Sequence, residues 1–528
     1  MTSSDLQECA RTPRRPIAEV WSLAWPTVLT MASYTVMQFV DGLMVSWVGP
    51  TEVAAQGNGG IWSFNLVAFA LGVLTVINTY VAQNLGAGRP QEGPKYAWAG
   101  AWLSLTVWVL LLLPWALALP WFFSLLGHGD KLRAQETGYA QILLVGSIFM
   151  LLGRSMHHYF FGMHRPKIIT VAAIVGNLCN GLFNYLLIFG AFGFPRMGIY
   201  GAAWGTVIGT VVELLIPAAI FLGPKMNREY RTRSAWRPHL APIRDILKIG
   251  WPAATQWGNE IVAWSIFMTI LVGKFGEEHM TAGWATLRYM HLSFMPAVGF
   301  SVAVSSLAGR YIGAGRRDLA ARRVHLGLAL AMSWMTICAL LFFFFREPLI
   351  GFFVSTQNVS PEEARRIIEI GGKLMICAAV FQTFDALGIV YMGGLRGAGD
   401  TVWPGVATIV LSWVLIVGGG WWMTMQWPEL ESVGPWIGAA VYIIVLGLAL
   451  WYRFESGAWK KIELVKPREA EVMTAAETAR AEHEQLKHDA AMVAPAMPGL
   501  PAPDAESSIR DFAESESEAI EGTSRAHQ

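Results

Sequence analysis

Residues 57–85, GNGGIWSFNLVAFALGVLTVINTYVAQNL, form a long run with no charged side chain, and Gly86-Ala87-Gly88-Arg89 follows directly. A helix needs about 20 mostly apolar residues to cross a lipid bilayer, so this run is long enough to span one. A similar signal returns in the second half of the chain, where Gly313-Ala314-Gly315-Arg316 closes another apolar run. The stretch therefore predicts both a membrane-spanning helix and an internal repeat.

The composition of the whole chain agrees with a membrane location. Hydrophobic residues make up 54% of the 528 residues and charged residues only 15%, whereas soluble chains carry about 25% charged residues. The 24 tryptophans and 53 glycines also fit, because Trp collects at membrane interfaces and Gly is tolerated in spanning helices. These figures exclude a soluble fold. The formal net charge of +1 gives no reason to expect a nucleic-acid partner.

Twelve runs in the chain are long and apolar enough to span a bilayer. They lie near residues 20–48, 57–85, 97–120, 138–162, 168–192, 199–222, 249–272, 283–308, 324–345, 374–395, 402–427 and 433–452. The loops on the side of the N-terminus contain more than twice as many Lys and Arg side chains as the opposite loops. Because cytoplasmic loops are enriched in Lys and Arg, we expect a multi-pass protein of the plasma (inner) membrane with both termini in the cytoplasm.

The repeat divides the chain into two halves. Trp25-Pro26 returns as Trp251-Pro252, at nearly the same offset as the Gly-Ala-Gly-Arg motif. We therefore expect an all-α fold of two six-helix bundles, related by a pseudo-two-fold axis along the membrane normal. The expected divisions are a cytoplasmic N-terminal segment (1–16), an N-terminal bundle (17–222), a basic cytoplasmic linker (223–248), a C-terminal bundle (249–455) and a disordered, acidic cytoplasmic tail (456–528).

Four acidic residues fall inside the predicted spans, where an ionisable group is costly and usually functional. Glu260 and Asp385 lie near the middle of their spans in the C-terminal half. They could share a cation or a proton, because carboxylates suit hard cations and because burial favours their protonation. Asp41 lies nearer the outer end of the first span. Glu213, in the sixth span, could form a structural ion pair or contact a substrate.

Basic and amide side chains at the same depth could serve these acids. Arg154 could pair with Glu213, and Arg288 with one of the acids of the C-terminal half, which would lower the cost of burial. A further polar set lies in the fifth span, where the spacing places three asparagines on one helical face, directed at a cavity or at a neighbouring helix. These asparagines are Asn177, Asn180 and Asn184.

In the order and duplication of its motifs, the chain resembles the MATE (multidrug and toxic compound extrusion) transporters, which are cation-coupled exporters built from two six-helix bundles. The resemblance covers about residues 17–455. The motifs that carry it are Pro26 with Val40-Asp41-Gly42, Gln83 to Arg89, Asn180 to Gly190, Pro252 followed by Glu260, Gly313 to Arg316, and Asp385 followed by Gly394-Leu395-Arg396-Gly397.

This resemblance implies roles for several of the polar residues. Glu260 and Asp385 match the acids of the cation site in sodium-coupled bacterial members, so a sodium ion could bind there. Asp41 matches an acid implicated in proton coupling, and Asn180 matches a polar partner of that site. Two positions depart from the pattern: Asn184 stands where some members have an aspartate, and Phe381 stands where a tyrosine assists the cation.

We therefore expect a monomeric antiporter that exports amphipathic, cationic drugs or other small organic cations through the lipid bilayer by alternating access. Sodium or protons would drive it, with no other cofactor, and it would not be an enzyme. Met37, Trp264, Met268 and Met295 could line the substrate cavity or serve only in packing. The alternatives are a flippase of lipid-linked precursors with a related fold, or a membrane receptor or enzyme that does not transport.

Overall fold

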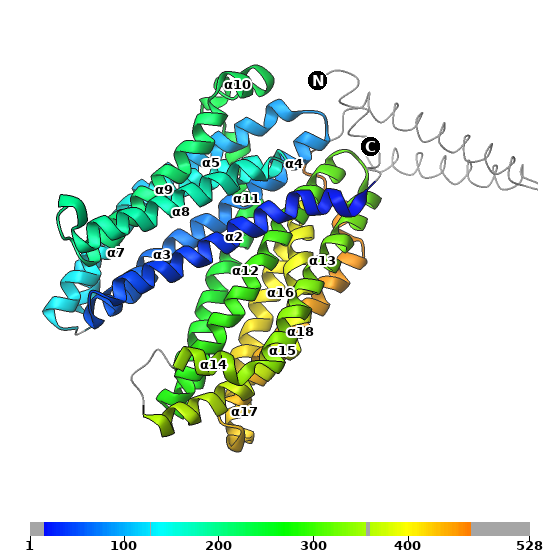
Figure 1. The fold of residues 1–528 in the computed structure, drawn as a ribbon. Coiled ribbons are helices and arrows are strands. Elements are labelled where there is room, and N and C mark those ends of the chain that lie inside the picture. Colours follow the sequence, from blue (N-terminus) through cyan, green and yellow to red (C-terminus); the bar gives the residue numbers. More distant parts are fainter. Residues whose placement is uncertain (1–14, 127, 355–359, 466–528) are drawn as a thin grey trace, which may run out of the picture. The chain divides into compact units, whose positions relative to one another are not determined.

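The computed structural model describes residues 15–126, 128–354 and 360–465, and within these ranges all regular elements are helices (Figure 1). The described helices belong to one compact unit, Met1–Pro467. The predictions for positions 1–14 and for most of the acidic tail lie outside the described residues.

The N-terminal half is built from eight helices. They are α2 (Pro16–Ser46), α3 (Pro50–Leu74), α4 (Val76–Gly86), α5 (Gly93–Val107), α6 (Leu113–Ser124), α7 (Asp130–Gly162), α8 (Pro166–Phe189) and α9 (Ile199–Phe221). Helix α3 continues into α4, and the π-helical turn η2 (Trp108–Leu112) joins α5 to α6, so these helices make six spans. The short helices of this half and of the connection are η1 (Pro90–Glu92), η3 (Ala191–Gly193), α10 (Pro224–Tyr230) and η4 (Ser234–Trp236).

The C-terminal half repeats this plan. Its main helices are α11 (Leu240–Ile266), α12 (Glu277–Gly313), α13 (Arg317–Phe344), α14 (Arg346–Val354), α15 (Pro361–Ala398), α16 (Val402–Leu411), α17 (Gly420–Gln426) and α18 (Val433–Glu455). The π-helical segments are η5 (Phe267–Val272) and η7 (Ser412–Gly419). The 3-10 turns are η6 (Gly273–Phe275), η8 (Pro428–Leu430) and η9 (Ala458–Lys461).

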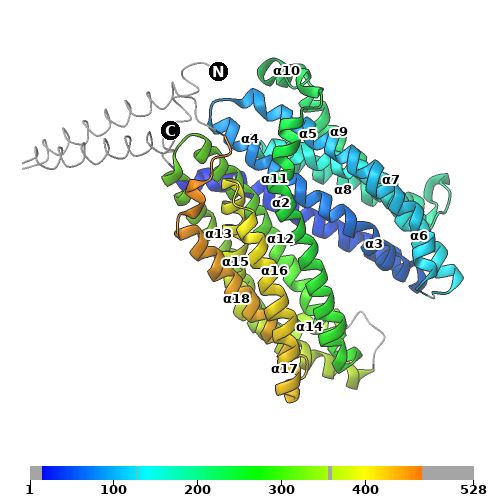
Figure 2. The same ribbon diagram turned by 180° about the vertical axis from the view of Figure 1, so that it is seen from behind.

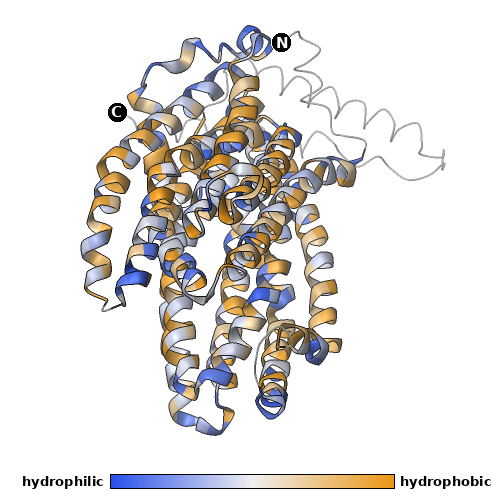
Figure 3. Ribbon diagram, turned by 60° about the vertical axis from the view of Figure 1, so that its left-hand side comes forward, coloured by the Kyte–Doolittle hydropathy of each residue, from blue (hydrophilic) through white to orange (hydrophobic). Residues whose placement is uncertain are grey.

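The predicted spans are present as long helices. In the described part of the chain, 11 helices are long and apolar enough to cross a membrane. The twelfth long helix, α11, is less apolar because it contains Arg244, Asp245 and Lys248 near its start and Glu260 in its last third. It begins at Leu240, inside the stretch expected to be a linker. Apolar residues run along the helices, and hydrophilic residues gather toward their ends and in the loops (Figure 3).

The two halves meet through their first two spans. Helix α2 packs against α8 of its own half and against α12 of the other half, and α3 and α4 pack against α11 and α12. The helices come together around α2, α4 and α12 and diverge toward α6 on one side and α17 on the other (Figures 1 and 2). The contact surface between the halves is therefore formed mainly by α2, α3, α4, α11 and α12.

The first helix of each half begins inside the core of the other half. Val20 and Leu23 of α2 belong to the hydrophobic core of the C-terminal half. Ile246 and Ile249 of α11 belong to the core of the N-terminal half. These two pairs occupy equivalent positions of the repeat, because the same offset separates them as separates the Trp-Pro motifs. We call these segments the exchanged helix starts.

Hydrogen bonds hold the exchanged helix starts in place. Glu19 accepts a hydrogen bond from Arg323 Nε at 2.6 Å and another from the Tyr311 hydroxyl at 2.6 Å. In the other direction, Asp245 Oδ2 accepts a hydrogen bond from the Tyr96 hydroxyl at 3.0 Å. Each acid at a helix start is thus bound by side chains of the opposite half. The two acids also occupy equivalent positions of the repeat.

The repeated Gly-Ala-Gly-Arg motifs explain how α4 and α12 can approach so closely. A Cβ atom on Gly86 would lie 1.8 Å from the carbonyl oxygen of Arg310, and one on Gly313 would lie 2.0 Å from that of Gln83. Only glycine lets the two backbones touch at these positions. We call this reciprocal contact the glycine junction. Next to it, Gln83 Nε2 donates a hydrogen bond to the carbonyl of Gly397 at 2.9 Å.

Candidate functional site

The two acids predicted at the centre of the C-terminal half come together in the structure. Glu260 lies on α11 and Asp385 on α15, and both side chains are partly buried. Their carboxyl groups are close enough to interact electrostatically. Two neighbouring carboxyl groups in an apolar surrounding cannot both stay ionised at low cost, so the pair would gain from binding a cation or a proton.

Two further residues complete this site, and the sequence analysis missed both. The Tyr442 hydroxyl on α18 donates a hydrogen bond to Glu260 Oε1 at 3.3 Å. Arg396, in the last turns of α15, is close enough to Glu260 to interact electrostatically. Arg396 follows Asp385 by about three helical turns, and this spacing could have placed both on one face of α15. No pattern in the apolar run around Tyr442 marks that phenol.

The donors at this site are two carboxyl groups and one phenol. Such hard oxygen ligands suit a sodium ion or a proton. Within the described residues there is no group of three or more His, Cys, Asp and Glu side chains that could hold a metal ion.

Two of the candidate site residues are buried in the hydrophobic core. The Phe381 and Met268 side chains are fully buried in the hydrophobic core of the C-terminal half. Met268 packs against Gly283 of α12, where there is no Cβ atom to exclude it. Of the two alternatives left open for Met268, packing is therefore the one that the structure shows, and Phe381 packs in the same core. Met37, Trp264 and Met295 are only partly buried, so they could still contact a ligand.

The arginines at membrane depth lie over aromatic rings. The Arg154 guanidinium is 5.0 Å from the centre of the Tyr34 ring, and that of Arg288 is 5.6 Å from the Phe353 ring. The ion pairs found in the described residues include neither arginine, so the expected pairings with Glu213 and with the acids of the C-terminal half are absent there. A guanidinium is weakly hydrated and stacks on aromatic faces, which gives it an alternative to a carboxylate.

In the N-terminal half, Asp41 is buried and bound by the predicted asparagines. Asn184 Nδ2 donates a hydrogen bond to Asp41 Oδ1 at 2.6 Å and lies 3.4 Å from Asn180 Oδ1. Asn180 in turn donates to the Thr206 hydroxyl at 3.4 Å. These hydrogen bonds connect α2 through α8 to α9. The hydrogen bond between Asp41 and Asn184 thus joins the C-terminal part of α2 to α8.

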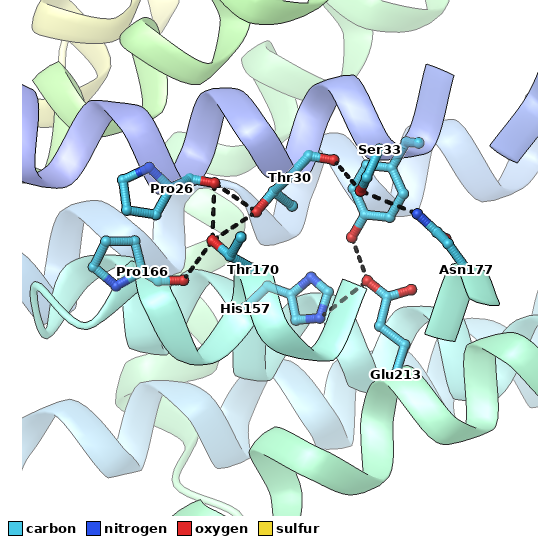
Figure 4. A network of polar contacts seen from close by, with 9 residues as sticks. Pro26, Thr30, Ser33, His157, Pro166, Thr170, Asn177 and Glu213 are labelled. Carbon is cyan, nitrogen blue, oxygen red and sulfur yellow. Dashed lines mark hydrogen bonds and ion pairs between the residues drawn. The ribbon is translucent and has the colours of Figure 1, made fainter. Parts of the chain in front are cut away.

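Glu213, on α9, is the centre of a second polar set. Its partner on α2 is Tyr34, about two helical turns before Asp41. Glu213 accepts a short hydrogen bond from the Tyr34 hydroxyl, and His157 Nε2 lies 3.5 Å from its Oε1 (Figure 4). Nearby, Asn177 donates to the Ser33 hydroxyl at 3.0 Å. All three predicted asparagines thus lie among the helices that bury these acids.

The proline of the first repeated motif anchors α2 at the other end of this set. The Pro26 carbonyl accepts hydrogen bonds from the Thr30 and Thr170 hydroxyls, each at 2.8 Å (Figure 4). The two hydroxyls are 3.0 Å apart. Because Thr170 belongs to α8, the polar contacts of α2 with α8 and α9 extend from Pro26 to Asp41.

An apolar cavity of about 460 Å³ lies between the halves. Its lining comes from α3, from α5 with η2, and from α11, and it includes Phe69, Leu112 and Val262. Gly258 and Ile261, which flank Glu260 in the sequence, also line it. The cavity has the size and apolar character of a small-molecule site.

Comparisons with known proteins agree with this architecture. The MatE family model matches residues 26–186 and 261–422, one segment in each half. The chain is 30% identical over 454 residues to a probable multidrug resistance protein NorM of Synechococcus sp., covering 84% of this chain and 95% of that protein. It is 29% identical over 450 residues to a probable NorM protein of Burkholderia pseudomallei, covering 84% and 93%.

Solved structures show the same fold. A MOP superfamily transporter from Pyrococcus furiosus aligns with a TM-score of 0.76 at 21% identity, over 88% of this chain and all of that chain. A multidrug resistance MATE family transporter in an outward-facing conformation aligns with a TM-score of 0.76 at 21% identity, with the same coverage. At this identity, the likeness concerns the fold alone.

Proposed function

The chain belongs to the MATE family of membrane transporters, and from this premise we propose that it exports amphipathic organic cations in exchange for sodium ions or protons. It is a multidrug efflux transporter with many membrane spans, and not an enzyme. The proposal concerns its substrates, its coupling ion and the exchange mechanism.

The pairing of Glu260 with Asp385 carries the proposal. The two carboxyl groups are partly buried and lie beside Tyr442. A cation or a proton bound there would remove the electrostatic repulsion between them. An ion that binds one conformation better than the other shifts the equilibrium between them. If the ion favours the conformation that releases the drug, and the drug favours the opposite one, the ion gradient drives export.

The space between the halves supports the proposed substrate class. An apolar cavity borders α11 on one side of Glu260, and the partly buried Met37, Trp264 and Met295 offer polarisable contacts. Methionine and aromatic side chains adapt to ligands of different shape. An organic cation could place its apolar body on such residues and its charge near Glu260 or Asp385.

We propose that the transporter lies in the plasma (inner) membrane and that the glycine junction faces the cytoplasm. The first and last described segments lie at this end, because Glu19 contacts Arg323 at 2.6 Å and Glu463 contacts Arg317 at 3.2 Å. The Lys- and Arg-rich loops lie on the same side by sequence, as the positive-inside rule requires. The transporter would act as a monomer, since both halves of the pathway come from one chain.

Transport by purified protein in liposomes tests the proposal. A fluorescent organic cation is exported under an imposed sodium or proton gradient, and we expect Glu260→Gln and Asp385→Asn to abolish export driven by the coupling gradient. Glu362→Gln, at an exposed acid in the first turn of α15, is the matched control and should transport normally. Full gradient-driven export by both site variants would refute the coupling role of this pair.

A further inference from the structure

The polar set around Glu213 is not part of the proposed cation or proton site at Glu260 and Asp385. Glu213 is the only acidic or basic residue of α9, and 15% of its side chain is exposed. Its carboxyl group accepts a hydrogen bond from the hydroxyl of Tyr34 on α2 and lies 3.5 Å from His157 Nε2 of α7. Three helices therefore meet at one carboxyl group inside a membrane-spanning bundle.

Among the described residues, no permanently charged basic group lies within ion-pair distance of Glu213, and Arg154 interacts with it electrostatically only from farther away. From α2 comes the Tyr34 phenol, and from α7 come His157, with His158 beside it, and Arg154, whose guanidinium lies over the Tyr34 ring. From α8 comes only the backbone of Gly176, packed against the Glu213 side chain. In the described residues, the one basic group within ion-pair distance of Glu213 is His157.

The imidazole ring of His157 is buried without a full set of hydrogen bonds. Its side chain is only 3% exposed, and among the described residues neither of its ring nitrogens has a hydrogen-bond partner. Buried polar groups in proteins are nearly always hydrogen-bonded, so an ionised carboxylate 3.5 Å from a neutral imidazole would leave both groups poorly compensated. A proton on Glu213, or shared between Glu213 and His157, would remove the uncompensated charge.

We propose that Glu213, with Tyr34 and His157, forms a second protonation site in the N-terminal half, separate from Asp41. The inference rests on the proposed exchange function, which it extends by a second proton carrier. Within the described part of the chain, no hydrogen bond joins the two sets, because Asp41 leads to Asn184 and Asn180. The step is simple proton binding: a proton from water adds to the carboxylate, and its loss restores it.

The position of Tyr34 shows how this proton acts on the rest of the molecule. Tyr34 is on α2, and its hydrogen bond to a carboxylate is stronger than one to a neutral carboxyl group. Proton binding at Glu213 therefore weakens the attachment of α2 to α9. Helix α2 also packs against α12 and donates a hydrogen bond from Thr27 to the carbonyl of Gly299 at 2.8 Å. Protonation at Glu213 is thus transmitted to the contact between the halves.

Infrared difference spectroscopy of the full chain in liposomes tests this inference without relying on transport. Between mildly acidic and mildly alkaline pH, the wild type should gain and lose the C=O band of a protonated buried carboxyl group. We expect Glu213→Gln to lose one component of this band and Asp41→Asn to lose a different one. The matched control is Glu136→Gln, at another buried acid of this half that lies 2.8 Å from a histidine, His128. It should keep both components.

An unchanged band in Glu213→Gln would overturn the proposal. If that variant does not fold, Glu213→Asp takes its place: a shifted component supports the site, and an unshifted one refutes it. Export of an organic cation is measured in the same liposomes. Loss of the Glu213 component in a protein whose wild type exports nothing would refute the proposed function and leave the protonation site standing. Export by a protein that shows no Glu213 component would refute the protonation site and leave the proposed function standing.

Discussion

Replacing Gly86 by alanine should open the glycine junction. The new Cβ atom would lie 1.8 Å from the Arg310 carbonyl oxygen, whereas ordinary contacts begin at 3.4 Å, so the two helices must move apart. The obstructing atom belongs to the backbone and cannot rotate away. Overpacking costs about 1–3 kcal/mol, and at the upper end the ratio of closed to open junctions should fall roughly 100-fold.

Labelling of a buried cysteine would measure this change. Ser306 is buried and donates a hydrogen bond from its hydroxyl to the carbonyl of Phe161 across the halves at 2.6 Å. Ser306→Cys, in a chain without its native cysteines, should react slowly with a water-soluble maleimide. We expect the reaction to accelerate when Gly86→Ala is added, because the surface between α7 and α12 becomes accessible.

Gly57→Ala is the matched control for this experiment. A Cβ atom at Gly57, in α3, would meet no atom within 4 Å. The substitution should leave the labelling rate unchanged and could raise stability slightly, because alanine favours the helix over glycine by about 1 kcal/mol. Equal labelling rates and equal thermal stability in the two alanine variants would refute the reasoning about the glycine junction.

Three further variants test an ion pair, a hydrogen bond and a buried histidine of the described residues. Arg323→Ala leaves the Glu19 carboxylate without its buried partner at 2.6 Å. The substitution should lower the free energy of unfolding by about 3–5 kcal/mol. Adding Glu19→Gln should recover part of this loss, as measured by thermal melts. Tyr442→Phe removes the 3.3 Å hydrogen bond to Glu260 without changing packing, so calorimetry should show weaker binding of the coupling cation, and unchanged affinity would contradict its role. Burial lowers the pKa of His164, in the α7–α8 turn, to about 3. Because the unfolded chain takes up this proton first as the pH falls, stability should decline from about pH 6.5 to about pH 3. This decline should be smaller in His164→Asn, which also tolerates the positive φ of 56° at this position.

Most of the architecture could be predicted because the bilayer imposes a length on each helix and the repeat imposes an order. The run 57–85 became α3 and α4, and its motif became half of the glycine junction. The helix ends were less predictable. Helix α12 spans 37 residues, Glu277–Gly313, against a predicted 283–308, because its ends are charged and escape a count of apolar residues.

The candidate site was predictable only for residues whose chemistry is unusual in a membrane. Glu260 and Asp385 are conspicuous in apolar runs, and they do come together. Tyr442 is not conspicuous, because a phenol is common in such runs and its partner depends on the rotation of α18. The rotation of a helix also decides whether a large apolar residue points to a cavity or to the core, which is why the sequence left both roles open for Met268, a core residue in the structure.

The choice of partner for an arginine also depends on distances that a sequence does not contain. Arg154 is placed on α7 so that its guanidinium meets the Tyr34 ring, 5.0 Å away. Tyr34, in turn, takes the Glu213 carboxyl group that charge alone would assign to Arg154. Pairing by charge ignores such intermediate residues, so the sequence could identify Glu213 and Arg154 but not the phenol of Tyr34 that lies between them.

The exchanged helix starts make the molecule a domain swap within a single chain. The first helical turns of each half pack in the hydrophobic core of the other half, so neither core is complete without the other half. A chain cut between α10 and α11 would yield two fragments that each expose apolar residues and need each other to fold. The halves should accordingly melt in one transition. Any rocking between them must turn about these interlocked ends, because pulling them apart would expose both cores at once.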